Sequence, residues 1–316
     1  MPEPPGVGPA VPLQVQLSEI SSWLNSSLLL NFLTGIYTVI YFGTLYLSYS
    51  RLSQRRIVVV AISLLYLLAL VNLGLQWWLM QWSFVDNGQT RNTVFFTVYN
   101  LPPGVHITSS IQGFLTIILA DGLLVWRCFN VWNRSVRMIT LPLVLVVTET
   151  ALFLSTVIRL SVEKLHPKDP QIINNLDGAG YFVSAATSLL TTLLIAYRIH
   201  FIFRHDGASR GRFKHLIEIL IQSSAVYSLT LLMNAISVIL PIDETNTQFF
   251  AFQNYIPFTP ISGLAPTVMV AQVYLAADNA NETSKLTALA FRANIEESES
   301  RVEKGEITVT NGIPSS

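Results

Sequence analysis

Long apolar stretches recur along this chain, and short polar segments separate them. The stretch from Ile57 to Leu75, for example, contains no charged residue. A helix rises ~1.5 Å per residue, so about 20 residues cross a hydrocarbon core ~30 Å thick. Because lipid cannot hydrogen-bond to backbone groups, a span of this length and apolarity is expected to be a helix. The pattern predicts seven spans, at about 28–49, 57–80, 108–129, 138–159, 178–199, 217–240 and 248–275.

Two terminal segments flank these spans. Residues 1–27 are proline-rich, and Glu3 and Glu19 are their only charges. They lack the basic region of a cleaved signal peptide, so we expect the first span to act as an uncleaved signal anchor. Residues 278–316 are rich in Glu, Ser and Thr, a composition that predicts a disordered, acidic tail. We therefore predict an all-α membrane protein with a seven-transmembrane-helix bundle at 28–277.

Composition and charge placement agree with this architecture. Apolar residues make up 51% of the chain and charged residues 12%, against about 25% charged in soluble domains. Counted together with the adjoining span ends, the first, third and fifth connections carry eleven Lys and Arg residues, and the second and fourth carry four. Positive residues in short loops stay cytosolic, so we predict the N-terminus outside and the C-terminus in the cytosol. The zero net charge gives no indication of nucleic-acid binding, and one cysteine, Cys128, excludes an intrachain disulfide.

The connection at 198–216 is the most basic of the three on the predicted cytosolic side. We expect it to be the contact surface for a cytosolic signalling partner. In a scaffold, the same charges would instead hold anionic lipid at ~1 kcal/mol each. The basic residues of this surface are Arg204, Arg210, Arg212 and Lys214.

Two carboxylates, Asp121 and Glu149, fall well inside the predicted spans. A charged carboxylate there costs at least ~2.5 kcal/mol, so each must face the bundle interior, water or a partner, or be protonated. No basic residue lies at the depth of Glu149, which we expect to be neutral or water-linked and bonded to neighbouring hydroxyls. Asp121 lies within reach of a snorkelling Arg127 or Arg198. Both a polar switch or ion site and a structural hydrogen-bond node fit these acids.

Polar side chains at helical spacing mark one face of the span 178–199 and one face of the span 217–240. Both faces are expected to point inward, because lipid offers hydroxyl groups no partner. Small polar residues also hold membrane helices together at ~0.6 kcal/mol per contact, so packing and a ligand cavity both fit the pattern. The first face carries Tyr181, Ser184, Ser188 and Thr191, and the second carries Ser223, Tyr227, Thr230, Asn234 and Ser237.

The last predicted span is interrupted by Pro257, Pro260, Gly263 and Pro266. This spacing predicts a kinked or broken helix. A broken helix at membrane depth is tolerated only where it lines protein or a water-filled cavity. It fits a moving element in a receptor as well as an ion site in a transporter.

Several kinds of site lack their sequence signatures. No lysine falls in a predicted span, so retinal has no attachment point. The histidines, at 106, 166, 200, 205 and 215, show neither the pair spacing of a metal site nor Cys partners. P-loop, Gly-rich nucleotide and Gly-x-Ser-x-Gly motifs are absent from the sequence. We therefore expect no metal, no cofactor and no enzymatic activity.

Two segments carry a resemblance to a known family. One runs from Ala120 through Asp121, Arg127 and Arg134 to Leu141-Pro142, and the other is Gly263-Leu264-Ala265-Pro266-Thr267. Together they resemble a large family of uncharacterised seven-helix membrane proteins of mushroom-forming basidiomycete fungi. The likeness covers about residues 28–280. It implies seven helices and carries over no activity and no residue roles.

Receptors of the rhodopsin class offer an analogy in topology alone. Their usual Asp/Glu-Arg-Tyr triplet is replaced here by Trp126-Arg127-Cys128, and Ala265-Pro266-Thr267-Val268-Met269 lacks the Asn and Tyr of Asn-Pro-x-x-Tyr. The leading hypothesis is a receptor-like signalling protein of the plasma membrane that senses a small ligand or peptide. A secondary transporter or channel using an intramembrane carboxylate is the alternative, and a non-catalytic membrane scaffold is the third.

Overall fold

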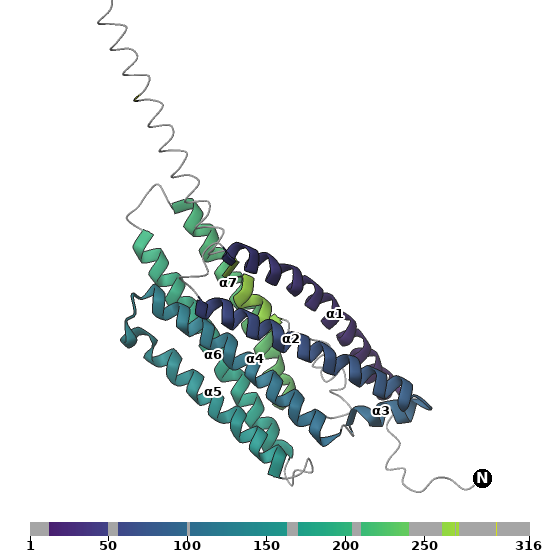
Figure 1. Ribbon diagram of the computed structural model, residues 1–316. Helices are drawn as coiled ribbons and strands as arrows, with labels where there is room; N and C mark the ends of the chain where they lie inside the picture. Colours follow the sequence, from purple (N-terminus) through teal and green to yellow (C-terminus); the bar gives the residue numbers. More distant parts are fainter. Residues whose placement is uncertain are drawn as a thin grey trace, which may run out of the picture. The chain divides into compact units, whose positions relative to one another are not determined.

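The computed structural model describes residues 13–49, 56–99, 102–162, 170–203, 210–239, 261–268, 270–271 and 295. Residues 1–271 belong to one compact unit, which contains every element discussed below. Residues 261–268 form a short helix (yellow-green in Figure 1), named the Pro266 helix here. The other elements are α1 (Leu13–Tyr49), α2 (Arg56–Gln81), the π-helical η1 (Trp82–Asp86), α3 (Arg91–Tyr99), α4 (Pro103–Val131), α5 (Val136–Val162), α6 (Pro170–Phe203) and α7 (Arg210–Ile239).

Six helices in the described part of the chain are long and apolar enough to cross a bilayer. Each coincides with one of the first six predicted spans, so the prediction of an all-helical, multi-pass membrane protein is confirmed at this level. The seventh predicted span, 248–275, lies mostly outside the described residues, and the count of seven and the orientation stay predictions. The six spans are Leu13–Ser48, Arg56–Asp86, Gly104–Val131, Val136–Val162, Gln171–Phe201 and Ile221–Ile239.

Helices extend into two segments that lie outside the predicted spans. The predicted N-terminal segment 1–27 includes the first turns of α1, which begins at Leu13. The connection between the predicted spans 57–80 and 108–129 contains η1, α3 and the first turn of α4, where Pro103 occupies the first helical position. Proline fits there because the first helical N–H has no partner in any case. Hydropathy detects the membrane-length apolar core and not the extension of a helix beyond it. The predicted tail, 278–316, lies outside the described residues except for Ile295.

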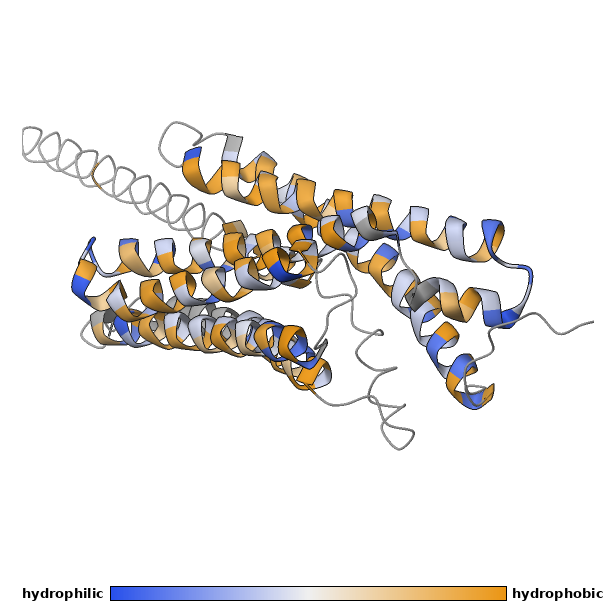
Figure 2. Ribbon diagram, turned by 90° about the horizontal axis from the view of Figure 1, so that it is seen from below, coloured by the Kyte–Doolittle hydropathy of each residue, from blue (hydrophilic) through white to orange (hydrophobic). Residues whose placement is uncertain are grey.

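Helices α4 and α6 each pack against three long helices. Helix α6 contacts α4, α5 and α7, helix α4 contacts α2, α5 and α6, and α2 also contacts α1. Large apolar side chains such as Val147 and Leu193 face outward at more than 60% exposure. Figure 2 shows hydrophilic residues (blue) mainly toward the helix ends. This distribution is the one expected in lipid, which solvates leucine as well as a protein core does.

Tyrosines join α1, α2 and the Pro266 helix. Tyr37 of α1 is fully buried and meets Tyr66 of α2 edge to face at 5.5 Å between ring centroids. The Thr267 hydroxyl donates a hydrogen bond to the Tyr37 hydroxyl at 3.3 Å. A Cβ added to Gly263 would lie 2.8 Å from the Tyr37 ring. Gly263 therefore allows the Pro266 helix to approach α1 closely, a packing role in addition to any effect on helix geometry.

We expect Gly263→Ala to lower the melting temperature of the detergent-solubilised protein by several degrees, because overpacking costs about 1–3 kcal/mol. Gly74→Ala is the matched control, since a Cβ added there meets no atom within 4 Å. Its melting temperature should be unchanged or raised. Equal melting temperatures for the two variants would contradict the close approach at Tyr37.

Candidate functional site

The two intramembrane carboxylates of the sequence meet inside the bundle. Asp121 lies on α4 and Glu149 on α5, and both side chains are 0% exposed. They lie about 15 Å and 20 Å along their helices from the turn that joins α4 to α5, so their depths are similar. The two carboxyl groups are close enough to interact electrostatically. We refer to Asp121 and Glu149 as the carboxyl pair.

The hydrogen bonds of the carboxyl pair are incomplete. Ser184 of α6 donates its hydroxyl hydrogen to Asp121 Oδ2. Tyr227 of α7, which is buried, also interacts with Asp121. In contrast, Asp121 Oδ1 and both carboxyl oxygens of Glu149 are buried without a partner in hydrogen-bonding geometry among the described residues. The predicted bonds from Glu149 to neighbouring hydroxyls are therefore not found in that part of the chain.

No positively charged side chain in the described part of the chain acts on either acid. Arg198, which the sequence offered as a snorkelling partner for Asp121, instead lies over the Trp132 ring at 5.1 Å. An opposite charge normally stabilises an ionised carboxylate in an apolar interior. Without one, two ionised carboxylates side by side would repel each other strongly.

The predicted polar face of α6 is buried and forms a hydroxyl network with α7. Ser184, Ser188 and Thr191 are all 0% exposed. Ser188 Oγ lies 3.2 Å from Ser224 Oγ and accepts a hydrogen bond from Ser228 Oγ at 3.1 Å. A further hydroxyl bond joins Thr192 of α6 to Ser224. The α6 stripe thus continues from the carboxyl pair along the α6–α7 interface.

The polar residues of α7 are divided between two faces. Ser224 and Ser228, which sequence reasoning did not single out, bond to α6. Thr230 and Asn234 instead donate to carbonyl groups of their own helix, at Val226 and Thr230. The i, i+4 spacing of Ser224 and Ser228 indicates that the two residues share one face of α7. The sequence alone cannot show that this face meets α6, because α7 carries hydroxyl groups over much of its circumference.

A third carboxylate, Asp177, belongs to the same face of α6. The predicted span begins at 178, so Asp177 falls just outside it. In the structure Asp177 lies within α6, which begins at Pro170. Asp177 lies within hydrogen-bonding reach of Thr156 on α5 and interacts with Tyr181. Its position, seven residues before Ser184, extends the inward stripe by two turns.

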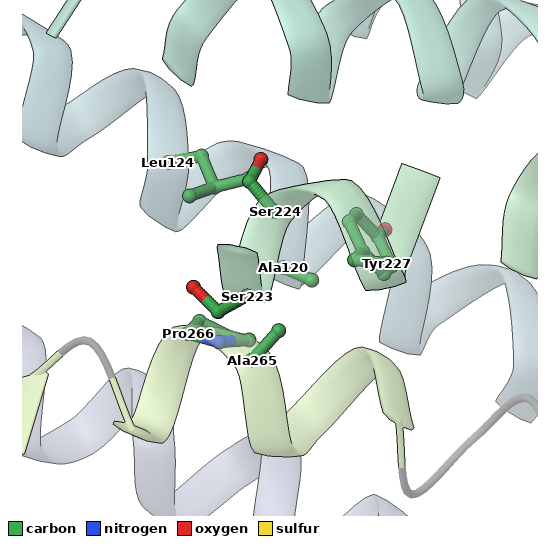
Figure 3. A pocket seen from close by; sticks show the side chains of 7 residues that line it. All are labelled: Ala120, Leu124, Ser223, Ser224, Tyr227, Ala265 and Pro266. Carbon is green, nitrogen blue, oxygen red and sulfur yellow. The ribbon is translucent and has the colours of Figure 1, made fainter. Parts of the chain in front are cut away.

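A cavity with room for about one water molecule, roughly 10 Å³, lies between α4, α7 and the Pro266 helix, and Tyr227 lines it. A more open groove of about 230 Å³ adjoins it, and the two share Ser223 and Ala265. Figure 3 shows the small cavity, which is lined by Ala120, Leu124, Ser223, Ser224, Tyr227, Ala265 and Pro266. The groove is lined by Gln222, Ser223, Val226, Ile261, Leu264, Ala265 and Val268.

The remaining predicted residues are only partly described. Pro266 lines the small cavity, whereas Pro257 and Pro260 lie outside the described residues. The predicted basic connection 198–216 is largely helical, because α6 extends to Phe203 and α7 begins at Arg210. Its member Arg204 lies outside the described residues, as do the side chains of Arg210, Arg212 and Lys214.

The described residues contain no group of three or more His, Cys, Asp or Glu side chains that could hold a metal ion. Comparison of the chain with family models, curated proteins and solved structures finds no match. The resemblance to a fungal seven-helix family therefore stays a prediction. The chemistry of the site rests on its geometry.

We expect Ser184→Ala to lower the free energy of unfolding by about 1–3 kcal/mol, because it leaves buried Asp121 Oδ2 without its donor. Ser161→Ala is the control, since that exposed hydroxyl bonds only within its own helix, to the Val157 carbonyl. It should change the free energy by less than about 0.5 kcal/mol. Denaturant titration in mixed micelles measures both values, and losses of equal size would argue against a strong Ser184–Asp121 bond.

Proposed function

We propose that this chain is a receptor-like signalling protein of the plasma membrane, in which a small ligand in the groove acts on the carboxyl pair. The observation that carries the proposal is that the groove and the small cavity share a wall. Ser223 and Ala265 line both the groove and the small cavity, and Tyr227, which lines the small cavity, interacts with Asp121. The shared wall and Tyr227 therefore connect a molecule in the groove to the buried acids.

The lining of the groove indicates the class of ligand. Val226, Ile261, Leu264 and Val268 make it apolar, while Gln222 and Ser223 provide hydrogen-bonding groups. Its volume lies just below the usual range of about 300–1,000 Å³ for small-molecule sites. These properties favour a small, largely apolar molecule with one or two hydrogen-bonding groups over a peptide.

The Pro266 helix is the element that such a ligand would move. It contacts α7 through Ala265 and Pro266 on one side and Tyr37 of α1 through Thr267 on another. A ligand changes a conformational equilibrium only by binding one state more tightly than the other. A shift of this helix against α7 would alter the packing of Tyr227 on Asp121. The basic start of α7, Arg210–Lys214, would then carry the change to a cytosolic partner.

Ligand-dependent recruitment of a heterotrimeric G protein tests this function. In cells expressing the full chain, a library of small apolar compounds should contain one that triggers recruitment. Ala265→Leu, which fills the shared wall, should lower the potency of that compound by about tenfold or more, equivalent to ~1.4 kcal/mol. Leu229→Ala, on the exposed face of α7, should leave the potency unchanged.

A second set of variants separates ligand binding from coupling. Replacing Arg210, Arg212 and Lys214 together by Gln should abolish recruitment while the compound still stabilises the purified protein against heat. Failure of the intact chain to recruit a G protein with any compound would overturn the receptor proposal.

A secondary transporter is the second candidate, and the unpartnered oxygens of Glu149 favour it. A buried carboxylate without a counter-charge is a common site for a coupling proton or cation in membrane proteins. The small cavity that Tyr227 lines has room for only about one water molecule, which is too little for a substrate, and this counts against the candidate. If neither function is found, the hydroxyl network would serve a membrane scaffold.

Ion flux into reconstituted vesicles decides between these candidates. Under the transporter function, Glu149→Gln should abolish uptake driven by a proton or sodium gradient. Asp86→Asn, which removes an exposed carboxylate, should retain it. Flux that is equal in the wild type and in Glu149→Gln would exclude a coupling role for Glu149.

A further inference from the structure

We propose that the carboxyl pair is a proton-binding site that holds one shared proton. We further propose that an aromatic layer, formed by Phe114, Phe153 and Tyr181, separates this pair from a proton-accepting carboxylate, Asp177. The inference does not depend on the proposed receptor function, because it rests on packing within α4, α5 and α6. It assigns a ligand, the proton, to the buried acids, and it assigns a gating role to Phe153.

The geometry of the pair suits a shared proton. Glu149 and Asp121 lie within hydrogen-bonding reach of each other. Three of their carboxyl oxygens are buried and have no other hydrogen-bond partner among the described residues. A proton placed between the two groups makes one of them a donor and leaves the other an acceptor. It also reduces the charge of the site from two to one. Paired carboxyl groups at close range commonly hold a single proton for this reason.

No other ionisable group at this depth offers a better partner in the described part of the chain. Tyr227 faces the pair from α7, and Ser184 faces it from α6. Helix α6 carries Tyr181 in the aromatic layer and Asp177 beyond it. Helix α2, which packs on α4, has no Asp, Glu, Lys or His from Ile57 to Gln81.

The aromatic layer lies between the pair and Asp177. Phe153 of α5 is 1% exposed, stacks on Phe114 of α4 at 4.3 Å between centroids, and meets Tyr181 of α6 edge to face at 5.7 Å. Gly180 creates the space, since a Cβ there would lie 2.4 Å from the Phe153 ring. An apolar layer this tight excludes the water that would carry a proton.

Helical spacing gives the order of the carboxyl pair, Phe153 and Asp177 along the bundle. On α5, Glu149, Phe153 and Thr156 follow i, i+4, i+7, and all three are buried. On α6, which runs the opposite way, Asp177 and Ser184 are also seven residues apart. Seven residues span about 10 Å of helix, so Asp177 and Thr156 lie roughly that far from the carboxyl pair, with Phe153 between.

The proton transfer balances without another reactant. The Asp177 carboxylate, which is only partly buried, takes a proton from water and becomes a carboxylic acid. When the Phe153 ring swings aside and water enters, Asp177 gives that proton to the carboxyl pair and the proton that the pair held leaves through the same water, so the pair again holds one shared proton and Asp177 returns to its carboxylate form. No electrons move, and no covalent bond other than O–H changes.

Infrared spectroscopy of the full chain in phosphatidylcholine vesicles tests the binding site. The wild type should show a carboxylic-acid C=O band that disappears in Glu149→Gln and shifts in Asp121→Asn. Absence of such a band in the wild type, or a band unaffected by both substitutions, would overturn the shared proton. This readout requires neither ligand nor flux, so it can fail while the receptor assay succeeds.

The rate at which that band shifts in D₂O tests the aromatic layer. Phe153→Ala should speed the exchange by about tenfold or more, while Phe182→Ala, on the exposed face of α6, should leave it unchanged. Should Phe153→Ala fail to fold, Asp177→Asn provides the test, because removing the accepting carboxylate should slow exchange. An exchange rate that is unaffected in whichever of these two variants is measured would refute the gate.

Discussion

The hydrogen bond from Ser184 to Asp121 joins α6 to α4 at a depth where lipid surrounds the helices. Lipid offers a carboxylate neither a donor nor a counter-charge, so Asp121 can lie there only with protein on every side. That requirement orients α4, and Glu149 places the same requirement on α5. Because α6 supplies the donor, it must pack against α4 at this depth. Much of the arrangement of α4, α5, α6 and α7 follows from burying these two acids.

The hydroxyl groups extend this constraint along the α6–α7 interface. Ser188, Ser224 and Ser228 bond to one another across the two helices, although each could have bonded to its own backbone. Such contacts are individually weak in membranes, at ~0.6 kcal/mol. Their value here is geometric, because they set the rotation of α7 and so direct Tyr227 toward the carboxyl pair. Close packing at Gly180 and Gly263 then holds Phe153 and Tyr37 in place.

The buried acids also limit how stable the bundle can be. A carboxyl group without its full set of hydrogen bonds lowers stability, and polar sites of this kind persist in proteins mainly where they have a function. The small cavity that Tyr227 lines has space for about one water molecule, and the groove that shares Ser223 and Ala265 with it is larger. Under the proposed function the ligand lies in the groove, and Tyr227 links the small cavity to Asp121.

The sequence by itself determined the helical spans, since a long apolar run in lipid has only one stable backbone structure. It also singled out Asp121, Glu149 and the α6 stripe, because a polar side chain at membrane depth must face inward. Only the tertiary structure decided that the two acids meet, that Ser224 and Ser228 face α6, and that Asp177 lies inside α6. Hydropathy and spacing specify the inward side of a single helix. Which inward groups touch depends on how neighbouring helices are rotated and shifted against one another, and close packing at residues such as Gly180 settles that.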